Sequence, residues 1–201
     1  MTNSRAVEFP HERYFGKATG GKIGMWIFLV TDAMTFGGFL LAYANLRALL
    51  EWPNPSEYLN ISLTAAATFI LICSSVSMVL ALTSGREENR KGMVGWLGVT
   101  IAGGLTFLGI QAFEWTHLIV EGMTLTRFGH GVPQFGSTFF LITGFHGLHV
   151  LSGVIYLLII MLRAKKGRYD KGNIDHVEIA GLFWHFVDLI WILVFTFIYL
   201  L

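Results

Sequence analysis

The amino-acid sequence predicts an all-α, polytopic membrane protein with five transmembrane helices. Of its 201 residues, 54% are hydrophobic and only 13% are charged, whereas soluble domains carry about 25% charged residues. The charged residues gather between long apolar runs, and each run is long enough to cross a bilayer as a helix. Because the connectors are too short for a separate soluble domain, residues 23–201 are expected to form a single transmembrane domain.

The chain begins with a polar leader, residues 1–22, in which no signal peptide is visible. The first helix is expected over residues 23–50, a long apolar run with Asp32 near its middle. A Trp-Pro-Asn-Pro turn follows at residues 52–55, where two prolines and an asparagine stop a helix. The second helix is then expected over residues 59–83, which are rich in Ala, Ser and Thr.

The last three helices follow the same pattern. The third is expected over residues 93–120 and opens with glycines spaced for close packing. The fourth is expected over residues 134–162 and holds two histidines, His146 and His149, in its middle. A strongly basic connector separates it from the fifth helix, which is expected over residues 175–201.

Lysine and arginine are distributed unevenly over the connectors. Twelve of the fourteen lie in the leader and in the second and fourth connectors, which share one side of the membrane in a five-helix chain. The other two, Arg47 and Arg127, belong to the opposite side. Because cytoplasmic loops carry an excess of Lys and Arg, the N-terminus is expected in the cytoplasm and the C-terminus outside.

Composition also excludes several classes of function. The net charge is +1 and no basic patch exceeds the size of a loop, so no nucleic-acid partner is expected. Cys73 is the only cysteine, which rules out an intrachain disulfide and a structural zinc bound by several cysteines. The sequence has no phosphate-binding loop, no nucleophile with its base and no paired catalytic acid and base, so no catalytic site is expected.

Three helices place ionisable side chains near the middle of the membrane: Asp32 on the first, His146 and His149 on the fourth, and His185 and Asp188 on the fifth. Within each pair, the three-residue spacing puts both side chains on one helix face. Ionisable groups are costly in lipid, so they are functional candidates by default. Two compatible interpretations of Asp32 stay open: a protonated carboxyl hydrogen-bonded to a neighbouring helix, and a role in proton handling.

The histidines and Asp188 are interpreted first as groups that hydrogen-bond between helices. The alternative is ligation of haem or a metal ion, because imidazole suits iron, copper and zinc. A His-x-x-His spacing is weak evidence by itself, so no metal site is expected. Gln111 and Glu114 are expected to form a packing or interface feature towards the outer surface, and Glu178 is expected to lie close to the inner one.

Four motifs follow one another along the chain: GMWxF at residues 24–28, QxxEW at 111–115, TGFHGLHV at 143–150 and WHFVDLIW at 184–191. Together they resemble the signature of subunit III of the haem-copper oxidases, such as cytochrome c oxidase. The resemblance covers nearly the whole chain from Gly21 on. Five helices resemble the short bacterial form of this family, which lacks two N-terminal helices of longer relatives.

The resemblance implies a non-catalytic subunit that binds no redox cofactor itself. In this family, subunit I carries the haems and a copper, and subunit II carries the domain where the electron donor docks. Subunit III packs beside subunit I in the bacterial cytoplasmic membrane and holds phospholipids. It supports proton uptake and the durability of the catalytic subunit.

The resemblance also assigns roles to two residues. Asp32, which follows Thr31, falls where the family commonly has a buried glutamate that reacts with carbodiimide; here the side chain is one methylene shorter. Arg163, at the inner end of the fourth helix, matches a family arginine that binds a lipid phosphate, whose oxygens fit the guanidinium fork. One departure is the sequence Leu200-Leu201, where relatives often have tryptophans.

The leading hypothesis is therefore an accessory subunit of a terminal oxidase whose electron donor is cytochrome c. Within the family, the alternatives are a subunit of a quinol oxidase and an accessory subunit of nitric oxide reductase. Another class is a membrane cytochrome that ligates haem through His146, His149 and His185. A third class is a small transporter with Asp32 as proton carrier, which lacks support because no inverted repeat or broken helix is visible.

Overall fold

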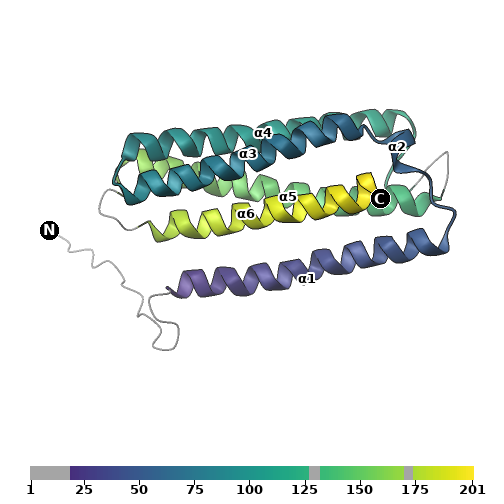
Figure 1. Ribbon diagram of the computed structural model, residues 1–201, viewed down its shortest axis with the longest axis horizontal. Coiled ribbons are helices and arrows are strands. Elements are labelled where there is room, and N and C mark those ends of the chain that lie inside the picture. Colours follow the sequence, from purple (N-terminus) through teal and green to yellow (C-terminus); the bar gives the residue numbers. More distant parts are fainter. Residues whose placement is uncertain (1–18, 127–131, 170–173) are drawn as a thin grey trace.

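The computed structural model describes residues 19–126, 132–169 and 174–201, and its regular structure over these ranges is entirely helical (Figure 1). Five helices of the described chain are long and apolar enough to cross a membrane, which confirms the predicted fold class. The elements, in chain order, are α1 Gly20–Leu49, α2 Pro55–Tyr58, α3 Ile61–Arg86, α4 Arg90–Val120, α5 Pro133–Lys165, α6 Asp175–Phe195 and the π-helical turn η1 Thr196–Leu200.

The observed helix bounds differ from the predicted ones by a turn or less. The largest difference lies between α1 and α3, where Pro55 begins the short helix α2 although both prolines were expected to stop a helix. Proline suits the first turn of a helix, because its fixed φ is helical and its missing N–H would have no partner there. Most of the predicted leader lies outside the described residues, and Lys22 already belongs to α1.

Asparagine side chains fix where α3 and α4 begin. The Asn60 side-chain oxygen accepts a hydrogen bond from the backbone N–H of Leu63 at 3.1 Å, and Asn89 accepts one from Gly92 at 3.0 Å. Each bond satisfies one of the N–H groups that the first turn of a helix leaves without a partner. These caps replace the predicted starts at residues 59 and 93.

α6 lies within the bundle, packed against α1, α3 and α5 (Figure 1). Its fully buried Trp184 and Trp191 stand two helical turns apart and reach α3. The Trp184 indole N–H donates to the Ser74 hydroxyl at 3.1 Å, and the Trp191 indole N–H donates to the Thr68 hydroxyl at 2.8 Å. The Ser and Thr residues that enrich α3 therefore serve as hydrogen-bond partners for α6.

Glycines allow α4 to approach its neighbours closely. A Cβ atom at Gly103 would lie 2.7 Å from the Ser74 Cβ, and one at Gly104 would lie 2.5 Å from the Trp184 ring. Beside them, the hydroxyls of Ser77 and Thr100 are hydrogen-bonded at 2.7 Å. This close packing of small residues is typical of helix association in membranes.

Candidate functional site

The strongest candidate site lies where α1 contacts α5. Asp32 of α1 is buried, with 8% of its side chain exposed, and its Oδ1 lies 3.4 Å from Nε2 of His149 on α5. The other ring nitrogen of His149, Nδ1, lies 2.7 Å from the backbone carbonyl oxygen of Phe145. Two residues that the sequence singled out on different helices are thus brought together.

Aromatic side chains surround this pair. The His149 ring centroid lies 5.5 Å from that of Phe36, 4.7 Å from that of Phe145 and 6.4 Å from that of Phe183. The second oxygen of Asp32, Oδ2, is buried and has no hydrogen-bond partner among the residues described. The pair therefore occupies largely apolar surroundings, where any charge is costly.

His146 and His149 both lie on α5, but they have different neighbours. It is 1% exposed, and its ring centroid lies 4.9 Å from that of Trp191 on α6 and 5.8 Å from that of Phe107 on α4. Neither ring nitrogen has a hydrogen-bond partner within the described part of the chain. The expected hydrogen bond from His146 to another helix is therefore not formed among the described residues. The imidazole packs instead against aromatic side chains of α1, α4 and α6, which enclose it.

Of the predicted pair on α6, Asp188 faces α3. Asp188 is buried, at 8% exposed, and its carboxyl has the Ser75 hydroxyl of α3 and the His185 ring as neighbours. His185 is only partly buried. Asp188 therefore lies at the contact between α3 and α6 and is separate from Asp32.

Glu114 forms a second polar centre, towards the opposite end of the bundle from Lys22. Its carboxyl accepts hydrogen bonds from the Thr64 hydroxyl of α3 at 3.0 Å and from the Tyr199 hydroxyl of η1 at 2.8 Å. Glu114 is 5% exposed and Gln111, one turn earlier, is 7% exposed. The carboxyl thus joins three elements within the bundle, where the sequence indicated only a packing or interface role.

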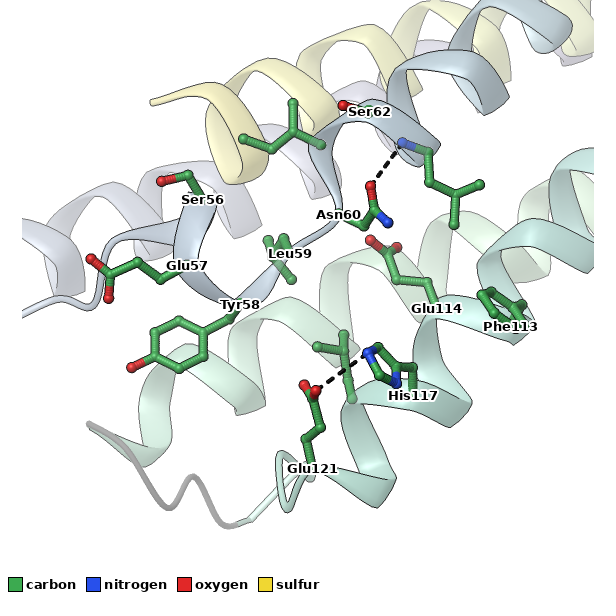
Figure 2. A pocket seen from close by; sticks show the side chains of 13 residues that line it. Ser56, Glu57, Tyr58, Leu59, Asn60, Ser62, Phe113, Glu114, His117 and Glu121 are labelled. Atoms are coloured by element: carbon green, nitrogen blue, oxygen red, sulfur yellow. Dashed lines mark hydrogen bonds and ion pairs between the residues drawn. The ribbon is translucent and has the colours of Figure 1, made fainter.

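A pocket of about 460 Å³ opens beside Glu114, between α2, the start of α3 and the end of α4 (Figure 2). Its lining includes the ionisable side chains of Glu57, His117 and Glu121, and His117 Nε2 lies 3.2 Å from a Glu121 oxygen. Figure 2 shows the Glu114 carboxyl beside Asn60, facing the segment that joins α2 to α3. Sequence reasoning missed this pocket because α2 was not expected.

At the other end of the bundle, acidic and basic residues connect α1, α3 and α6. Lys22 Nζ lies 3.0 Å from Asp175 and 2.5 Å from Glu178, and Arg86 lies 3.0 Å from the other oxygen of Glu178. The expected inner-surface residue Glu178 is thus the centre of an ion-pair network. The sequence did not single out Lys22 or Arg86 as its partners, because both appeared only as cations of the connectors.

Arg163 lies near the end of α5, on the same side of the bundle as Lys22, and its side chain is exposed. Nearby, Arg90 at the start of α4 donates hydrogen bonds to the backbone carbonyls of Ala164 and Lys165. The end of α5 is therefore held by Arg90, while the Arg163 side chain stays accessible.

No group of three or more His, Cys, Asp and Glu side chains in the described ranges is arranged to hold a metal ion. The site geometry consists of one Asp–His pair between α1 and α5, one hydrogen-bonded carboxyl beside a pocket, and one ion-pair network. Such groups can hold protons and connect helices.

Comparison with known proteins adds an independent finding. The family model described as cytochrome c oxidase subunit III matches residues 10–201. The chain is 31% identical over 180 residues to cytochrome c oxidase subunit 3 of Alkalihalophilus pseudofirmus, covering 89% of this chain and 85% of that protein. It is 33% identical over 199 residues to cytochrome bo(3) ubiquinol oxidase subunit 3 of Pseudomonas aeruginosa, covering 98% and 93%. It is 34% identical over 181 residues to cytochrome c oxidase subunit 3 of Thermostichus vulcanus, covering 89% and 86%.

Proposed function

This chain belongs to the cytochrome c oxidase subunit III family, and from that premise we propose how it serves its complex. It is subunit III of a haem-copper terminal oxidase, a multi-pass membrane protein that works in a complex with other oxidase subunits. The observation that carries this function is the family match over residues 10–201. The proposal is that the chain packs on subunit I in a bacterial cytoplasmic membrane, with the electron donor docking on subunit II and the haems and copper held by these partners.

The lipid-facing or partner-facing surface supports this arrangement. On α5, large apolar side chains project outwards at helical spacing: Leu148, Leu151, Ile155, Leu158 and Leu162. A stripe of this kind is compatible with lipid or with an apolar face of a neighbouring membrane subunit. Arg163 follows the stripe directly and is exposed, which supports the proposed contact with a phospholipid phosphate.

The proposed proton role belongs to Asp32. Its carboxyl is buried on α1 and has the imidazole of His149 at 3.4 Å as its partner. Ionisable groups within membrane helices mark proton relays in many membrane proteins. We assign to Asp32 a supporting part in proton uptake by the oxidase, outside the reaction with oxygen.

Co-purification tests this function. The tagged chain is isolated from its native membrane in mild detergent, and the visible spectrum of the preparation is recorded before and after the partner subunits are stripped away. The expected result is an oxidase complex whose haem absorption bands disappear from the preparation when the partner subunits are removed. A Soret band that stays with the isolated chain, or a stable chain with no haem protein attached, would contradict the proposal.

The electron donor is proposed to be cytochrome c, and quinol is the second candidate. The second candidate is favoured by the relative named as a ubiquinol oxidase subunit, which aligns over 98% of this chain. The same purified complex decides between them. Oxygen consumption with reduced cytochrome c supports the first, and consumption with quinol alone supports the second.

A further inference from the structure

Each ring nitrogen of His149 faces a polar atom, and the contact at Nδ1 shows where one ring proton lies. Nδ1 lies 2.7 Å from the carbonyl oxygen of Phe145. A carbonyl oxygen can only accept a hydrogen bond, so Nδ1 must carry a hydrogen. In a neutral imidazole only one nitrogen is protonated, which leaves Nε2 as an acceptor.

The second contact then requires another proton. Nε2 faces Asp32 Oδ1 at 3.4 Å, and an ionised carboxylate can only accept hydrogen bonds. Two bare acceptors facing each other in apolar surroundings would both be desolvated without a partner. We infer that Asp32 and His149 form a dyad that shares a single proton between Asp32 Oδ1 and His149 Nε2.

The surroundings of the dyad indicate where this proton rests. The rings of Phe36, Phe145 and Phe183 lie around His149, and the exposed fractions of the two side chains are 8% for Asp32 and 14% for His149. Forming a carboxylate and an imidazolium in such surroundings would require two charges to be held away from water, which is costly. The resting dyad is therefore a neutral carboxylic acid that donates to a neutral imidazole.

The proton can also move within the dyad. Transfer from Asp32 to His149 breaks the O–H bond and forms an N–H bond, leaving a carboxylate and an imidazolium with no change in net charge. After this transfer, a proton from outside could bind the carboxylate at Oδ2, which has no partner among the described residues. Loss of the Nε2 proton would then return the imidazole to its neutral form. This capacity rests on the proposed function, because the oxidase would supply the demand for protons.

Infrared spectroscopy of the whole purified oxidase tests the dyad. The variants are Asp32→Asn, which keeps the shape of the side chain without its proton, and His149→Phe, which keeps a ring without nitrogens. The matched control is His146→Phe, because His146 lies one turn away on α5 and neither of its nitrogens has a hydrogen-bond partner within residues 19–126, 132–169 and 174–201. Isotope-labelled aspartate separates the band of interest from those of glutamates.

The expected result is a carboxylic-acid C=O band that disappears in Asp32→Asn. The same band should move to higher wavenumber in His149→Phe, where the acid loses its acceptor, and stay in place in His146→Phe. Absence of an acid band assigned to Asp32, or a band that His149→Phe leaves unmoved, would overturn the dyad.

Proton uptake during turnover, measured on the same preparations, separates the dyad from the proposed function. If the band behaves as expected but Asp32→Asn takes up protons at the normal rate, the dyad stands and the proton role of Asp32 is removed. If Asp32→Asn slows proton uptake while His149→Phe leaves the band unmoved, the proton role stands and the dyad is refuted.

Discussion

At the scale of single residues, the polar side chains of this protein differ in what they do, although the sequence presents them alike. His146 and His149 are three residues apart and share a motif, yet one packs between aromatic rings and the other faces Asp32. The difference comes from their neighbours on α1, α4 and α6, which lie far away in the sequence. Glu114 gains its role in the same way, from hydroxyls of Thr64 and Tyr199.

The substitution Tyr199→Phe tests the buried contact of Glu114. It removes the hydroxyl that lies 2.8 Å from the carboxyl, and a hydrogen bond between membrane helices contributes about 0.6 to 2 kcal/mol. We expect the subunit to dissociate from the detergent-solubilised oxidase at a lower temperature. Tyr156→Phe serves as the control, because Tyr156 is only partly buried. Equal dissociation temperatures for the two variants would count against the role of the Tyr199 hydroxyl.

At the scale of helices, the sequence predicted the structure well where an apolar run is long and polar segments bound it at both ends. The existence of five membrane-crossing helices followed from the number and length of the apolar runs, because the bilayer demands about 20 consecutive apolar residues. The short helix α2 was missed, since a proline that ends one helix can also begin the next. The pocket beside Glu57 and Glu114 was missed with it.

The pairing of residues across helices could not be predicted in the same way. Depth along each helix put Asp32 and His149 at similar levels, but which faces meet depends on how the helices rotate and pack. The ion pairs of Lys22 with Asp175 and Glu178 depend on the same packing. Spacing within one helix carries no information about these rotations.

A glycine substitution tests the packing of α4 against α6. A Cβ atom at Gly104 would lie 2.5 Å from the Trp184 ring and 2.8 Å from Val154, so Gly104→Ala forces these side chains to shift. Overpacking of this kind costs about 1 to 3 kcal/mol. Gly109→Ala on the same helix is the matched control, since a Cβ atom there has nothing within 4 Å.

Thermal unfolding of the solubilised complex measures both glycine variants. Gly104→Ala is expected to unfold at a lower temperature than the unmodified protein. Gly109→Ala should be neutral or stabilising, because alanine favours a helix over glycine by roughly 1 kcal/mol. A Gly104→Ala variant as stable as Gly109→Ala would show that the α4–α6 contact is looser than described.

At the scale of the whole molecule, the bundle has different chemistry at its two ends. One end holds the ion pairs of Lys22, Arg86 and Glu178, and the other holds the Glu114 hydrogen bonds and the acid-lined pocket. The distribution of lysine and arginine predicts that the first of these ends faces the cytoplasm. Arg163 lies at this end, where the phosphates of the inner leaflet would lie.

The variant Arg163→Ala tests the proposed lipid contact. It removes a fork of hydrogen-bond donors that fits a phosphate, so less phospholipid should co-purify with the complex. Lys165→Ala is the control, because it removes one positive charge from the same exposed end of α5. Mass spectrometry of lipids extracted from the two variants makes the comparison, and equal phospholipid content in both would contradict a specific role for Arg163.

The packing of α1 has a consequence for how the chain is assembled. The helix α1 packs chiefly against α5 and α6, which follow it in the chain and are synthesised after it. Asp32 therefore enters the lipid before its histidine exists, and it meets His149 only after α5 has been inserted. A helix that reaches the bilayer early is thus completed by one that arrives later, so a chain that ended before α5 would leave a carboxyl group stranded among acyl tails.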